Sequence, residues 1–258
     1  MSISLHGHLH LYPMRSLEPA SSESAPSLES KTVSKSVHKS VSRAAKPAKA
    51  RHRFRTDSWL SLKDANLLLR KRAQMEANQG SYSAALIILN QLTVYEPENA
   101  ENFANRGLMH YNLGSCEQAL ADYNRAIEIN PELDKAYSNR ANLHATRQNW
   151  ADAIADYDEA IDLNPLNIRA RLNQAITLRE MGDYDEALVC LDIAMFFRPQ
   201  SATLYAERGR TYHLQGHWNC AIADYTKARA LTQDDSLQDI SSRQRVNKRV
   251  MRWINALA

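Results

Sequence analysis

The chain has 258 residues, 44% of them hydrophobic, so it can bury a core of ordinary globular size. Seven glycines and eight prolines are few for an all-β protein rich in turns. No run of about eighteen apolar residues occurs, which argues against a transmembrane helix. The three cysteines form no CxxC pair, which favours a reducing compartment over a disulfide framework.

The net charge of +3 is unevenly distributed along the chain. Residues 1–57 carry ten Lys or Arg against four acids, and the part from Lys31 to Arg55 holds nine cations and no acid. Because this Ser/Lys-rich segment has too few apolar side chains to offset the entropy of ordering it, we predict a disordered basic tail over 1–57. Its composition also suits an organellar transit peptide, although its early acids count against one. The predicted localisation is therefore cytoplasmic, with an organelle interior as the alternative.

Beyond the tail, the sequence repeats itself every 34 residues. A weak capping box, Ser61 followed by Asp64, precedes the first apolar run and predicts a helix start. Glycine in the middle of a period permits a tight turn, and proline near its end stops a helix, so each period predicts a helical hairpin. One hairpin cannot bury its apolar face alone, but a stack of hairpins can. The recurring residues are Pro97, Pro131, Pro165 and Pro199; Ala85, Ala119, Ala153, Ala187 and Ala221; and Gly80, Gly114, Gly182 and Gly216, with Gln148 in the remaining copy.

Several segments resemble the tetratricopeptide repeat family, among them Asn105-Arg106-Gly107, the run from Gly182 to Ala187, and the run from Ile161 to Pro165. The resemblance implies an all-α fold, namely a right-handed α-solenoid of helix-turn-helix repeats. We expect a disordered N-terminal tail before it and a C-terminal capping helix after it. The five repeats are placed within a domain over 58–235, at 66–99, 100–133, 134–167, 168–201 and 202–235.

A charged pair recurs within the hairpins. Arginine lies sixteen residues before aspartate in three repeats, whereas the fourth repeat has Gln174 and Cys190 at these positions and so loses both charges together. We therefore predict an ion pair between the two helices of each of these three hairpins, with a structural role. The pairs are Arg106 with Asp122, Arg140 with Asp156, and Arg208 with Asp224.

The last segment, 236–258, has apolar residues on one helical stripe, including Val246, Val250 and Trp253, and cations on another face. We predict a helix that caps the end of the stack. A basic amphipathic helix on a membrane surface is the alternative.

The positions left over after the packing registers lie on the opposite face of each first helix, and in the resembled family this face forms a concave peptide-binding groove. Here it is rich in cations and amides, so we expect an acidic or C-terminal peptide segment of another protein as the partner. The asparagines that recur at one position could instead bridge neighbouring hairpins. The predicted groove residues are Arg70, Gln74, Asn105, Lys135, Asn139, Asn142, Arg169, Asn173 and Arg179.

The predicted function is a protein-interaction scaffold or adaptor, which the resemblance links to complex assembly. One alternative is a localisation factor that attaches to membrane or nucleic acid through the tail and the last helix. Another is a co-chaperone with a partial carboxylate clamp, from whose pattern Gln74 and Asn139 depart. No glycine-rich phosphate loop, nucleophile elbow or HExxH motif occurs, so we expect no enzyme activity, catalytic residue, cofactor, metal site or small-molecule substrate.

Overall fold

The computed structural model describes residues 61–233 and 240–255, with the backbone alone for 240–242. The predicted disordered tail, 1–57, lies outside these residues. The described part of the chain contains eleven α-helices and no β-strand. The first helices of the hairpins are α1 (Leu62–Asn78), α3 (Ala100–Asn112), α5 (Asp134–Thr146), α7 (Ile168–Met181) and α9 (Ala202–Gln215). The second helices are α2 (Tyr82–Tyr95), α4 (Cys116–Ile129), α6 (Trp150–Leu163), α8 (Tyr184–Phe197) and α10 (Trp218–Gln233), and α11 (Ile240–Asn255) follows.

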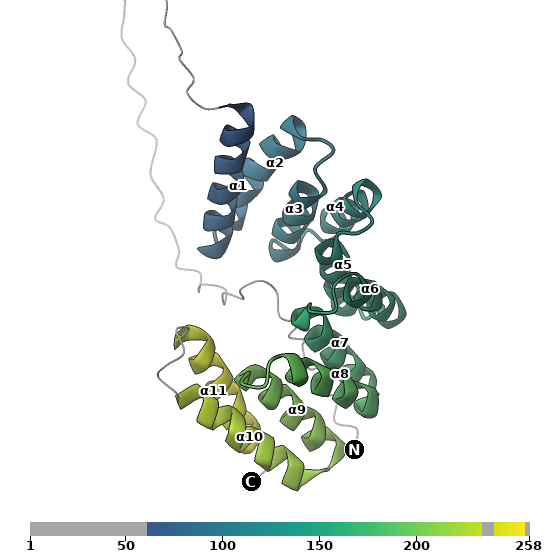
Figure 1. The fold of residues 1–258 in the computed structure, drawn as a ribbon, viewed down its shortest axis with the longest axis vertical. Helices are drawn as coiled ribbons and strands as arrows, with labels where there is room; N and C mark the ends of the chain where they lie inside the picture. The colour runs from purple at the N-terminus through teal and green to yellow at the C-terminus, as the bar shows by residue number, and fades with distance from the viewer. Residues whose placement is uncertain (1–60, 234–239, 256–258) are drawn as a thin grey trace, which may run out of the picture.

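The hairpins stack side by side into a curved right-handed α-solenoid, which confirms the predicted fold class (Figure 1). The first helices α1, α3, α5 and α7 lie toward the concave side, and the second helices α2, α4, α6 and α8 lie on the outside. Each second helix packs against the first helix of the next hairpin. None of the described helices has the length and apolar character needed to cross a membrane.

The helix boundaries follow the predicted start and turn signals. The amide of Asp64 donates to Ser61 Oγ at 3.2 Å, and the amide of Ser61 donates to Asp64 Oδ2 at 3.3 Å, so the capping box is formed. The turn within four hairpins contains a glycine with φ between +78° and +96°, as at Gly114. Gln148 adopts φ of +61° at the matching position, a conformation that costs free energy for a residue with a Cβ atom.

In the core, small residues of one helix of a hairpin pack against large residues of the other helix. A Cβ atom added at Gly107 would lie 2.7 Å from the ring of Tyr123, and one at Gly209 would lie 2.8 Å from the ring of Tyr225. Both tyrosines are fully buried. Glycine therefore lets the helix backbone approach the tyrosine ring, at a cost in helix propensity that the close packing offsets.

The predicted Arg–Asp pairs are confirmed, and each arginine also reaches the preceding hairpin. The guanidinium of Arg140 donates to both carboxylate oxygens of Asp156, at 2.8 and 2.7 Å, and to Asn124 Oδ1 at 2.7 Å. In the fourth hairpin, Gln174 replaces the arginine and donates to Asp158 of the preceding hairpin at 2.6 Å. The two equivalent sets are Arg106 with Asp122 and Asn90, and Arg208 with Asp224 and Asp192. These arginines thus fasten a hairpin internally and to its neighbour.

The helix α11 caps the C-terminal end of the stack. It packs on α9 and α10, and Val246 and Val250 are buried against Ala206, Tyr225 and Ala228. The stripe that the sequence predicted for a capping helix is therefore used for packing.

A buried ionic network, which the sequence did not reveal, joins α11 to the solenoid. Glu207 on α9 is fully buried and accepts hydrogen bonds from Arg179 of α7 at 2.9 Å and from Arg249 of α11 at 2.5 Å. Because a charge in the protein interior requires a partner, Glu207 fixes both arginines and with them the relative positions of three helices.

We expect Arg140→Ala to lower the free energy of unfolding by about 3 kcal/mol, because the largely buried carboxylate of Asp156 would lose its bidentate partner. Arg125→Ala is the control, since Arg125 makes only exposed ion pairs with Glu98 and Glu128, and it should change stability by less than about 0.5 kcal/mol. Urea denaturation followed by circular dichroism measures both. Equal effects of the two substitutions would contradict the structural role of the pair.

We expect Glu207→Gln to weaken the docking of α11, because two arginines would then face a neutral amide in a buried site. Amide hydrogen exchange by mass spectrometry should show faster exchange in α11 and α9, with less change in α3 and α4. Glu180→Gln is the matched control, since Glu180 is partly exposed and approaches Arg179 only at 3.7 Å. Unchanged exchange of α11 in Glu207→Gln would show that the network does not hold this helix.

Candidate peptide-binding groove

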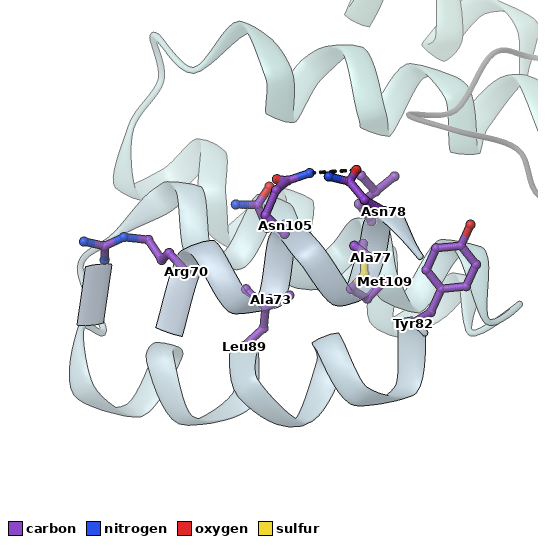
Figure 2. Close-up of a pocket in the computed structure, with 10 residues that line it drawn as sticks. Arg70, Ala73, Ala77, Asn78, Tyr82, Leu89, Asn105 and Met109 are labelled. Atoms are coloured by element: carbon purple, nitrogen blue, oxygen red, sulfur yellow. Dashed lines mark hydrogen bonds between the residues drawn. The ribbon is translucent and has the colours of Figure 1, made fainter. Parts of the chain in front are cut away.

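A small depression lies on the first two repeats, between α1, α2 and α3 (Figure 2). Its floor is apolar, and Figure 2 shows Arg70 and Tyr82 at its opposite ends. Three of the predicted groove residues line it, namely Arg70, Gln74 and Asn105. The Gln74 amide donates to Asn78 Oδ1 at 3.3 Å, whereas Asn105 is exposed. The depression can therefore receive an apolar side chain beside a row of amide groups.

Arg70 has a partner within the chain. Its guanidinium forms an ion pair with Glu96, at the end of α2. Glu96 also accepts hydrogen bonds from Asn66 and Asn102, each at 3.0 Å. Burial alone would raise the pKa of Glu96, but these hydrogen bonds and the charge of Arg70 outweigh it, so the pKa is lowered. Glu96 is thus held ionised, and much of the positive charge of Arg70 is neutralised.

The middle of the inner surface presents its polar groups to solvent. Lys135 on α5 is exposed, and Asn139, one helical turn further on, is partly exposed. Arg169 on α7 is exposed too, and no carboxylate in the described part of the chain pairs with it. These three residues and Asn105 supply cations and amides on consecutive hairpins.

Asn142 and Asn173 have a different environment, although the sequence placed them in the same groove. Asn142 Oδ1 accepts hydrogen bonds from the hydroxyl of Tyr157 at 2.7 Å and from the amide of Asn173 at 2.8 Å. Both asparagines are buried. They connect α5, α6 and α7, so Asn173 has the bridging role that the sequence left open for the recurring asparagines.

Arg179 is likewise buried, in the network with Glu207. Of the nine predicted groove residues, the structure therefore leaves five accessible on the inner surface without a strong partner inside the chain. These five are Gln74, Asn105, Lys135, Asn139 and Arg169. The described residues contain no group of three side chains suited to hold a metal ion.

The outer surface carries a feature that the sequence reading missed. Val189, Ile193 and Phe196 lie on one side of α8 and are exposed, with 82% of Phe196 accessible to solvent. Their spacing of four and three residues is visible in the sequence and places them on one side of a helix.

Comparison with solved structures shows the same fold in proteins of low sequence identity. MamA residues 41 to the end from Desulfovibrio magneticus RS-1 matches with a TM-score of 0.58 and 16% identity over 69% of this chain and 100% of that one. A MamA structure labelled MSR-1 matches with a TM-score of 0.53 and 21% identity over 66% of this chain and 97% of that one. No curated protein matches the sequence.

Comparison with family models gives three matches, each described as a tetratricopeptide repeat. They span residues 69–141, 134–167 and 156–189, and so follow one another without a gap through the first four hairpins. Together with the stacked hairpins and the 34-residue period, these matches identify residues 69–189 as tetratricopeptide repeats.

Proposed function

We propose that this chain is an adaptor that holds an acidic segment of a partner protein on its inner surface. Protein-interaction scaffolds are the general class to which tetratricopeptide repeats belong. The observation that carries the finer proposal is the row of accessible cations and amides on consecutive first helices, at Asn105, Lys135, Asn139 and Arg169.

The chemistry of these groups favours an extended acidic peptide. Lys135 and Arg169 can pair with carboxylates, and the amides of Asn105 and Asn139 can both donate to and accept from a peptide backbone. The apolar depression beside Asn105 could receive one hydrophobic side chain of the same peptide. We propose that the chain contributes to complex assembly by holding such segments of the other proteins in a larger assembly.

A carboxylate clamp for the C-terminus of a chaperone is less well supported. Arg70 would be its first cation, but Arg70 is paired with Glu96. Gln74 and Asn139 occupy positions at which the clamp pattern has other residue types. We therefore favour side-chain carboxylates of the partner over its terminal carboxylate.

Attachment to a membrane through the last helix is also less well supported. The apolar side chains of α11 pack against α9 and α10, and Arg249 is bound to Glu207. The tail that could attach to nucleic acid or lipid lies outside the described residues, so this alternative rests on sequence composition alone.

We expect the triple substitution Asn105→Ala/Lys135→Ala/Asn139→Ala to weaken binding of an acidic peptide at least about tenfold, because it removes one cation and two amides. The measurement is fluorescence anisotropy with labelled Glu/Asp-rich peptides of about fifteen residues, each made with a free and with an amidated C-terminus, at two salt concentrations. Amidation should matter little, and affinity should fall with salt.

The matched control is Gln91→Ala/Asn219→Ala/Lys227→Ala, which removes the same kinds of group from exposed positions on outer helices. Equal loss of binding in both variants would contradict the groove proposal. Loss of binding on amidation alone would favour the clamp instead.

A further inference from the structure

The first helix exposes a surface that is buried in every other hairpin. Leu68 and Met75 on α1 are 52% and 59% accessible. In every later repeat, the residues at these two positions are at most 4% accessible, because the preceding hairpin covers them. They are Asn102, Ala136, Ala170 and Leu204 for Leu68, and Met109, Leu143, Thr177 and Thr211 for Met75.

This end face, defined here as Leu68, Arg72 and Met75, is a stacking surface that no hairpin covers in the described part of the chain. Lys71, at the repeat position of Asn105, borders it on the inner side. Its three residues lie on one side of α1, spaced by four and three. Arg72 occupies the repeat position of Arg106, Arg140 and Arg208. Each of these arginines donates a hydrogen bond to an Asn or Asp on the second helix of the preceding hairpin. The end face is thus suited to a helix with apolar side chains and acidic or amide groups.

The outside of the same molecule carries a helix with exposed apolar side chains and acidic groups. Val189, Ile193 and Phe196 on α8 form an exposed apolar stripe, here called the outer stripe. In the other hairpins the position of Ile193 is polar or charged, which makes the apolar residue exceptional. The equivalents of Ile193 are Gln91, Arg125, Glu159 and Lys227.

The charges around the two surfaces are opposite in sign. Helix α1 has four Lys or Arg and two acids, whereas neither α6 nor α8 has any Lys or Arg. Exposed carboxylates lie on the outer helices here: Glu186 and Asp192 on α8, of which Asp192 is paired with Arg208, and Glu159 and Asp162 on α6, at the positions equivalent to Ile193 and Phe196. Two end faces brought together would instead bring Arg72 and the neighbouring Lys71 of both copies close to one another.

We propose that the end face of one copy of this chain packs on the outer stripe of a second copy. Such a contact joins different surfaces of the two copies, so each copy can bind one neighbour at α1 and another at α8, and assembly continues beyond a dimer unless the contacts close into a ring. Since the inner surface takes no part, the assembly would display the peptide groove of every copy.

The contact is expected to be weak. A few side chains from single helices cover less than the roughly 1,200 Å² that stable complexes bury in total. Association should therefore require high protein concentration, and it should decrease as salt screens the opposite charges.

Sedimentation velocity and light scattering on the full chain test the proposal. The mean mass of the wild-type chain should rise with concentration beyond that of a dimer. Leu68→Glu/Met75→Glu should remain monomeric, and so should Ile193→Lys/Phe196→Asp, whose new residues already stand at these positions in other hairpins as Lys227 and Asp162. Circular dichroism checks that the helicity of each variant equals that of the wild type.

Mixing the two variants separates this contact from the alternatives. Each variant retains one intact surface, so an equimolar mixture should form a 1:1 complex that grows no further. The control Val94→Glu, an exposed outer residue of α2 at the position of Phe196, should assemble like the wild type. A wild-type chain that is monomeric at every concentration would overturn the proposal. An assembly that Leu68→Glu/Met75→Glu abolishes but Ile193→Lys/Phe196→Asp leaves intact would also overturn the proposal. That result would indicate two end faces in contact or a partner segment of another kind.

Discussion

Each hairpin of this solenoid relies on its neighbour to cover one of its apolar sides, and the rest of the structure depends on this constraint. Two helices of about fourteen residues cannot enclose a core, so the free energy of folding resides largely in the surfaces between hairpins. The bridging arginines act at these surfaces. Arg140 holds Asp156 within its own hairpin and Asn124 in the preceding one, so internal and neighbouring contacts form together.

The same constraint makes the two ends of the stack special. At the C-terminal end, α11 supplies Val246 and Val250 to the last hairpin, and Arg249 joins Glu207 in a buried network. At the other end, Leu68 and Met75 remain accessible in a position that is otherwise internal. A stack with one covered and one open end is asymmetric, and this asymmetry determines which contacts with other molecules the chain can make.

One position of the repeat shows how the environment changes along the stack. Asn105, Asn139, Asn173 and Glu207 are 34 residues apart and occupy equivalent places on successive first helices. Asn105 is exposed and Asn139 is partly exposed, whereas Asn173 and Glu207 are completely buried. Glu207 is covered by Arg179 and Arg249 from two neighbouring helices, and Asn173 packs on Asn142 of the preceding hairpin. The accessible inner surface thus belongs mainly to the first three hairpins and the beginning of α7.

The sequence by itself determined the period, the type of fold and the ion pairs, because these depend on relations that repeat at fixed spacing. Gly114 marks a turn, as glycine does in four hairpins, and Arg106 predicts its partner Asp122 through a spacing that recurs in three hairpins. Only the tertiary structure decided which groove residues are accessible. Asn142, Asn173 and Arg179 have the same residue types as a binding surface, but their partners Tyr157 and Glu207 come from other helices, and the distance along the chain conceals them. Burial depends on what covers a side chain, and that is a property of the assembled stack and not of any single repeat.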